Sequence, residues 1–226
     1  MSLAETIHAR LAAAADSSRA PGMQAYMKSA MPYLGVSAVP LRQICKAVFA
    51  DLRFEGAGHW QAEVLAIWRG ARFREERYAA IELTGLRSVR PFQRFDALPM
   101  YEEMIVTGAW WDYVDVIAAH RLLPILRNDG AAMRQAMRAW SVDADMWKRR
   151  SAILCQLDAK AQTDLELLYA CIAPSIASKE FFLRKAIGWA LRHHARIDPS
   201  EVARYVDEHP ELSGLSRREA LKHIKA

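Results

Sequence analysis

One acidic side chain and one indole have a spacing that suggests chemistry. Trp111 and Asp115 are four residues apart, so on a helix they lie on one face, at the edge of a stripe formed by Trp110, Val114 and Ile117. A carboxylate can act as a general base or stabilise positive charge, and the face of an indole attracts cations. We treat the pair as a candidate functional pair. The alternative is that Asp115 is an exposed or helix-capping acid.

A second tryptophan lies among cations. Around residues 183–196 the apolar residues of a helix form one stripe, and Trp189 falls on the opposite face. Aromatic rings among basic side chains are typical of surfaces that hold a nucleic-acid backbone. The alternative is that Trp189 packs against a neighbouring repeat while the charges are solvated. Its basic companions on that face are Lys185, Arg192 and Arg196.

Arg150 is placed unusually for an arginine. It falls on the apolar face of a helix over residues 145–157, near the helix N-terminus, among Ile153, Leu154 and Leu157. Burial and the helix dipole both disfavour a cation there, so the side chain needs an anion. That anion is either a carboxylate in an inter-repeat salt bridge or a phosphate of a ligand.

The elements that must position these residues are helices. Apolar residues recur at three-and-four spacing almost throughout, and no stretch combines strand-like alternation with the turns that hairpins prefer. Asp198-Pro199 indicates a helix start, and Ser216 with Glu219 has the spacing of a capping box. Short breaks are expected near residues 32–35, 56–58, 88–91, 128–130 and 209–214. We therefore predict an all-α protein.

A weak internal repeat refines that prediction. Aligned segments place aliphatic residues at Ile81, Ile153, Ile187 and Leu221, spaced 72, 34 and 34 residues apart, and Ile117 lies midway across the longest gap. Helical units of this length stacked in series are typical of an α-solenoid, although amphipathic helices also resemble one another by chance. No linker is long enough to divide the chain, so residues 1–226 are expected to form a single domain.

The composition limits the function classes. With 226 residues, 52% of them hydrophobic, the chain is neither disordered nor fibrous, and its net charge of +5 permits a polyanionic partner without requiring one. Three cysteines without a CxxC motif indicate core residues in a reducing compartment. There is no membrane-spanning run, HExxH, GxxxxGK[ST] or GxSxG motif, and the rings of adjacent His193 and His194 should diverge. We expect a cytoplasmic protein without metal or cofactor.

Several longer strings resemble a known family. They are the WWDYVD string at 110–115, WKRRSAILCQL at 147–157 and KEFFLRKAIGW at 179–189, with further matches at 25–36 and 215–224. On these residues the chain resembles the bacterial DNA alkylation repair enzymes of the AlkD type, which are alkylpurine DNA glycosylases. The resemblance covers nearly the whole chain.

The resemblance implies both a fold and a set of site residues. The fold would be an α-solenoid of HEAT-like antiparallel helix pairs with a concave basic face for DNA. Asp115 would be the catalytic aspartate, with Trp111 and Trp189 as the active-site tryptophans. Arg150 and Tyr26 would contact DNA. Further phosphate contacts would come from Lys185, Arg192, Arg218 and Lys222.

The implied reaction is hydrolysis of the N-glycosidic bond of cationic purines alkylated at N3 or N7 in duplex DNA. The substrates would be 3-methyladenine and 7-methylguanine, with bulkier adducts tolerated, and the product an abasic site made without a deep base-flipping pocket. The enzyme would act as a monomer, without cofactor, metal or membrane, at the nucleoid. Two other functions remain open, namely a catalytically silent solenoid that binds distorted or branched DNA and a protein–protein scaffold.

Overall fold

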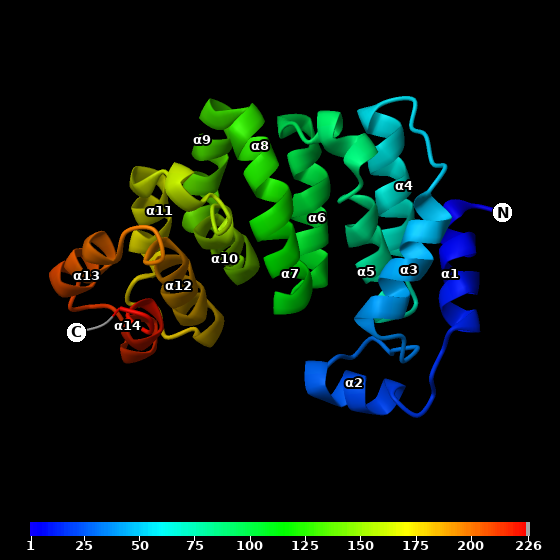
Figure 1. Cartoon of the computed structure of the whole chain (residues 1–226), viewed down its shortest axis with the longest axis horizontal. Helices are drawn as coiled ribbons and strands as arrows, with labels where there is room; N and C mark the ends of the chain where they lie inside the picture. The colour runs from blue at the N-terminus through cyan, green and yellow to red at the C-terminus, as the bar shows by residue number, and fades with distance from the viewer. Residues whose placement is uncertain (225–226) are drawn as a thin grey trace. The chain divides into compact units, whose positions relative to one another are not determined.

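The computed structural model describes residues 1–224, and the secondary structure in this range is entirely helical (Figure 1). The predicted all-α class is therefore confirmed. Contacts divide the chain into two compact units, Met1–Phe92 and Gln93–Ala226. No helix among the described residues is both long and apolar enough to cross a membrane.

The first unit holds five α-helices and a closing 3₁₀ helix. Within it, α1 packs against α3, α4 and α5, and α5 packs against α3 and α4. Glu75 is fully buried in this unit, and its carboxylate accepts hydrogen bonds from the backbone N–H groups of Leu34, Gly35 and Val36. The helices are α1 (Leu3–Ala13), α2 (Ala20–Met27), α3 (Ala38–Phe49), α4 (Ala57–Gly70), α5 (Arg74–Leu83) and η1 (Arg87–Phe92).

The second unit carries most of the candidate site. Its α10 packs against α7, α9 and α12, and α12 packs against α14. Its α-helices are α6 (Leu98–Gly108), α7 (Trp111–Ile117), α8 (Leu123–Asn128), α9 (Gly130–Ser141), α10 (Met146–Leu154), α11 (Leu165–Ile172), α12 (Phe181–His194), α13 (Pro199–Glu208) and α14 (Gly214–Ala220). Shorter helical turns are η2 (Phe95–Ala97), the π-helical η3 (Ala118–Leu122), η4 (Lys160–Gln162) and η5 (Ala173–Ser175).

Helices within each unit pack mainly against helices close to them in sequence, as in HEAT-like repeats. Four of the aliphatic residues used to align the repeat lie in the core, since Ile81, Ile117, Ile153 and Ile187 are each at most 4% exposed. The last one, Leu221, is only half-buried. The predicted HEAT-like repeat fold is confirmed. The concave basic face remains a prediction.

The helix-start signals had different outcomes. Asp198 caps α13, because its side chain accepts the backbone N–H of Glu201. The capping box at Ser216 was wrong. The cap of α14 is Ser213, one turn earlier, while Ser216 is buried and donates to the carbonyl of Arg184 on α12.

Close packing of α12 on α14 depends on Gly188. A Cβ at this position would lie 2.5 Å from the Cβ of Glu219 and 2.9 Å from the backbone oxygen of Ser216. These contacts are shorter than van der Waals separations, and one of them involves backbone. A side chain at residue 188 would therefore force the two helices apart.

We predict that Gly188→Ala lowers the free energy of unfolding by about 1–3 kcal/mol, the usual cost of overpacking. Urea denaturation followed by circular dichroism measures it. Gly22→Ala in α2 is the matched control, because a Cβ at residue 22 would have no neighbouring atom within 4 Å. That control should gain about 0.5–1 kcal/mol. Equal effects of the two substitutions would contradict the packing argument.

Candidate functional site

The helix that carries Asp115 begins abruptly and ends in an irregular turn. Ala109 is in the left-handed conformation (φ 43°), and Trp110 is extended, so the chain turns sharply between α6 and α7. After Ile117 the helix widens into the π-helical turn η3. Pro124, the second residue of α8, has no backbone N–H to donate to the preceding turn, which favours such a local rearrangement. Asp115 is therefore carried by a short helical segment between two irregular ones.

Asp115 and Arg150 form a bidentate ion pair. The Arg150 Nε donates to Asp115 Oδ1 at 2.7 Å, and Nη2 donates to Oδ2 at 2.8 Å. The third guanidinium nitrogen, Nη1, donates to the backbone carbonyl of Phe182 on α12. Arg150 on α10 thus links α7 to α12. The sequence left two anions open for Arg150, a carboxylate in a salt bridge between repeats or a phosphate of a ligand. In the structure the anion is a carboxylate.

The pair lies largely out of water, since the side chains of Arg150 and Asp115 are 5% and 12% exposed. Burial raises the pKa of the Asp115 carboxyl, and the hydrogen bonds and charge of Arg150 oppose that shift, while Asp112 adds to it. A carboxylate has about four lone-pair positions, and the guanidinium uses two of them. Asp115 therefore keeps acceptor capacity for a further donor, such as a water molecule.

An aromatic cluster lies beside the arginine. The ring of Phe182 lies 5.4 Å from that of Trp110 and 5.0 Å from that of Trp147, and the Arg150 guanidinium carbon is 5.8 Å from its centroid. Phe182 therefore connects the guanidinium to the rings of Trp110 and Trp147. Trp147 and Phe182 were not among the residues that helical geometry marked in the sequence. Trp147 lies three residues before Arg150, and this helical spacing was the available signal.

The two candidate tryptophans are both half-buried. Among the described residues Trp111 makes no hydrogen bond, ion pair or ring contact, so no such partner competes with a ligand for its indole. Trp189 meets His193 edge-on, with ring centroids 5.7 Å apart and an interplanar angle of 80°. Within residues 1–224 no ring contact or hydrogen bond joins Trp189 to Asp115.

The basic face predicted on α12 is partly neutralised. Lys185 Nζ lies 2.8 Å from Glu219 Oε1, and Arg192 bonds the other oxygen of the same carboxylate. The hydrogen bond from Lys185 is the main reason that the pKa of the Glu219 carboxyl is lowered. Arg218 and Lys222 are exposed and form no ion pair within the described chain. Of the four predicted phosphate contacts here, these two are the unpaired ones.

Tyr26, the remaining candidate, lies on α2 in the first unit. Its side chain is 78% exposed, the most exposed aromatic residue of the described chain. An aromatic ring so open to solvent contributes little to the core. Its predicted role in DNA binding stays a prediction.

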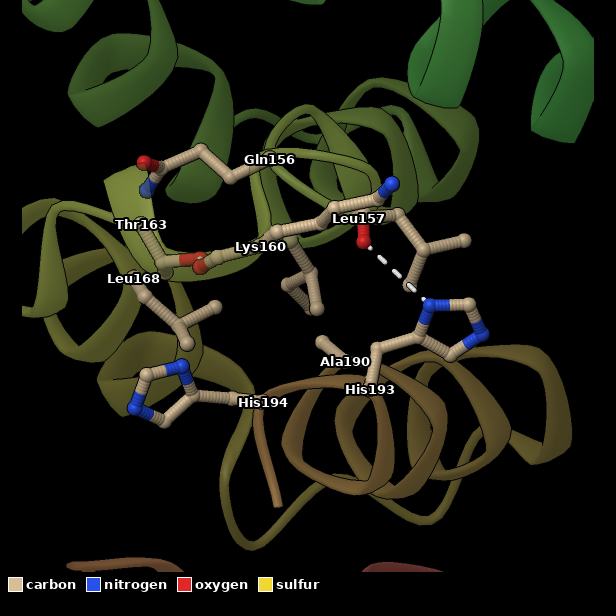
Figure 2. A pocket seen from close by; sticks show the side chains of 9 residues that line it. Gln156, Leu157, Lys160, Thr163, Leu168, Ala190, His193 and His194 are labelled. Atoms are coloured by element: carbon tan, nitrogen blue, oxygen red, sulfur yellow. Dashed lines mark hydrogen bonds between the residues drawn. The ribbon is translucent and has the colours of Figure 1, made fainter. Parts of the chain in front are cut away.

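His193 and His194 flank a small cavity beside η4, and their rings point apart (Figure 2). The ring Nδ1 of His193 lies 3.2 Å from the carbonyl oxygen of Leu157, whereas neither ring nitrogen of His194 has a hydrogen-bond partner. Burial lowers the pKa of both imidazoles. Within residues 1–224 no cluster of three His, Cys, Asp or Glu side chains could hold a metal ion.

Because the ion pair is buried, we predict that substitutions of Arg150 and Asp115 have strongly coupled effects on stability. Arg150→Met keeps the aliphatic stem but leaves the Asp115 carboxylate unpaired, so the free energy of unfolding should fall by about 3–5 kcal/mol. Adding Asp115→Asn should recover part of that loss, because the uncompensated charge is removed. Urea unfolding of the single and double variants at neutral pH measures the coupling.

The matched control for this cycle is Arg134→Met, which breaks the exposed pair of Arg134 with Asp164. It should cost less than about 1 kcal/mol. If the effects of Arg150→Met and Asp115→Asn simply add, the two side chains are not coupled and the pair does not organise the site.

His194 predicts a pH-dependent stability. Its pKa is lower in the folded than in the unfolded protein, so the unfolded chain binds the proton more readily. The contribution of His194 to the free energy of unfolding should therefore be fully present above the pKa of an unfolded histidine, about 6.5, and should be lost as the pH falls below it. His194→Phe should reduce this decline in urea titrations at several pH values. The exposed His223→Phe should leave the decline unchanged, and equal slopes for both variants would refute the assignment.

Comparison with known proteins identifies the family of the chain. Residues 7–224 match the family model described as DNA alkylation repair enzyme. A solved structure described as a predicted DNA alkylation repair enzyme from Enterococcus faecalis superposes with a TM-score of 0.84 at 26% sequence identity, covering 94% of this chain and 98% of that one. No curated protein matches. The chain belongs to the DNA alkylation repair enzyme family.

Proposed function

We propose that the protein is a monofunctional DNA glycosylase that hydrolyses the N-glycosidic bond of purines alkylated at N3 or N7 in duplex DNA. The observation that carries the proposal is the Asp115 carboxylate, which Arg150 holds in a nearly dry site with acceptor capacity to spare. Membership of a DNA alkylation repair family supports a repair role. We expect the enzyme to work as a monomer in the cytoplasm, at the nucleoid, without a cofactor.

The reaction needs one carboxylate and no general acid. A purine alkylated at N3 or N7 is already cationic, so it leaves without the protonation that most glycoside hydrolases must provide. As the bond to C1′ stretches, positive charge develops on the deoxyribose. The ionised Asp115 stabilises that charge and orients a water molecule for attack. The products are the free base and an abasic site, and the strand stays intact.

Aromatic and basic side chains supply selectivity and affinity. The faces of Trp111 and Trp189 favour a cationic nucleotide over a neutral one, by about 0.5–2 kcal/mol per contact. Tyr26, Arg218 and Lys222 are exposed and can reach phosphate oxygens, a contact independent of sequence. Lys185 and Arg192 contribute to DNA binding only to the extent that DNA phosphates compete with Glu219 for them.

Arg150 acts first as the partner of Asp115. All three of its guanidinium nitrogens donate, two to the Asp115 carboxylate and one to the Phe182 carbonyl, which uses three of the five N–H groups. Its side chain is only 5% exposed, so contact with a phosphate would require the side chains around it to move. We propose that Arg150 positions the carboxylate in the free enzyme and that it meets a DNA phosphate through the two N–H groups that neither acceptor uses.

Asp115→Asn tests the carboxylate directly. This variant should lower single-turnover excision of 7-methylguanine by about 10²–10³-fold, because the amide cannot stabilise the sugar cation, while duplex affinity stays near that of the wild type. Release of free base, measured by chromatography, gives the rate. Asp112→Asn, three residues earlier on α7, is the control and should keep most of the activity. Undiminished excision by Asp115→Asn would remove Asp115 from the mechanism.

A further inference from the structure

The first unit contains a hollow that the proposed reaction does not use. It lies between α3, α5 and the start of η1 and has a volume of about 330 Å³. We call it the α3–α5 hollow, defined by the cations Arg42, Lys46, Arg53 and Arg87, the acid Glu82 and the apolar residues beneath them. All of these residues belong to the first unit, Met1–Phe92.

The cations of the hollow are poorly neutralised. Lys46 and Arg87 are exposed and make no hydrogen bond or ion pair within the described chain. The Nε of Arg42 is 3.7 Å from Glu82 Oε1, a loose contact, and Arg53 donates only to the carbonyl of Leu52. By contrast, cations such as Lys185 and Arg192 on α12 each meet a carboxylate. The hollow therefore keeps its positive charge.

The helix dipoles and Glu82 neutralise only part of this positive charge. Both α3 and α5 end near the hollow, and each C-terminus contributes about half a negative charge, which favours nearby cations. Two such ends and Glu82 offset about two of the four positive charges. About two positive charges remain for a ligand, so the cluster exceeds what the fold itself requires.

The floor of the hollow is apolar. Cys45 and Phe49 line it and are 2% and 4% exposed, and burial raises the pKa of the Cys45 thiol to about 12, so the thiol stays neutral. A concave apolar wall focuses the field of the surrounding cations. A phosphodiester fits this arrangement, because its phosphate can meet the cations while its sugar contacts the apolar floor.

We propose that the α3–α5 hollow binds phosphate groups and that the DNA backbone supplies them. Through this contact the first unit would bind the duplex backbone whatever the base sequence and whether or not a base is damaged. This inference rests on the proposed function only in that DNA is the ligand, and it requires no chemistry at Asp115.

The test is binding of a short undamaged duplex, followed by fluorescence anisotropy between about 50 and 200 mM salt. Lys46→Gln with Arg87→Gln removes the two unpaired charges. Each lost phosphate contact lowers the slope of log affinity against log salt by about 0.9, so the slope should fall by about one to two. Affinity at the lowest salt should drop about tenfold.

Matched variants separate this effect from a general loss of charge. Arg134→Gln with Arg138→Gln removes the same number of charges from cations already paired with Asp164 and Glu166, and should leave the slope unchanged. Lys46→Arg with Arg87→Lys keeps the charge and should keep wild-type binding. At saturating protein, the Gln double variant should excise 7-methylguanine at the wild-type rate. Disproof of phosphate binding in the hollow is thus distinguishable from disproof of the proposed glycosylase activity.

A second arm identifies the source of the phosphate. Thermal unfolding of the wild type and of the Gln double variant is compared with and without inorganic phosphate. If phosphate stabilises only the wild type while duplex binding is the same for both proteins, the assignment to DNA is overturned. If neither duplex binding nor phosphate stabilisation differs between the two proteins, the hollow is not a phosphate site.

Discussion

The ion pair between Asp115 and Arg150 is the interaction on which the candidate site depends. Three helices meet through it, because Arg150 on α10 binds the carboxylate on α7 and the carbonyl of Phe182 on α12. Two buried charges are costly unless their geometry is good, and here the pairing is bidentate and the ring of Phe182 lies beside the guanidinium. The arrangement fixes the carboxylate in one orientation before any substrate arrives. Preorganisation of this kind is what stabilises charge that develops during a reaction.

The helical scaffold and the unusual residues could be predicted from the sequence. Periodicity alone identified the helices and the aliphatic core of the repeats, and the same helical geometry marked Asp115, Arg150 and Trp189 as misplaced for a plain core or surface. Periodicity could not show which side chain pairs with each charged residue. Arg150 needed an anion, but only the packing of α7 on α10 shows that this anion is Asp115. The pairing depends on three-dimensional contacts between residues that are 35 positions apart.

Glu219 illustrates the same limit at another place. Its spacing from Ser216 suggested a capping box, a local interaction, yet its carboxylate binds Lys185 and Arg192 from α12. Close approach at Gly188 makes this possible, since a side chain there would hold α14 away. A tertiary contact thus replaced a local one. As a result, the positive charge that the sequence placed on α12 is reduced, and unpaired cations remain at Arg218, at Lys222 and in the α3–α5 hollow.

The central claim is that this chain releases alkylated bases by hydrolysis, and one assay of the wild-type protein tests it. The protein is incubated with a duplex that carries a single 7-methylguanine, and free base, abasic sites and strand breaks are each quantified. Hydrolysis by this chain should give free base and abasic sites in equal amounts, with strand breaks only after treatment with alkali. Binding of the duplex without release of base would contradict the proposed glycosylase activity and favour a DNA-binding protein without catalysis. Strand breaks before alkali would contradict the hydrolytic mechanism.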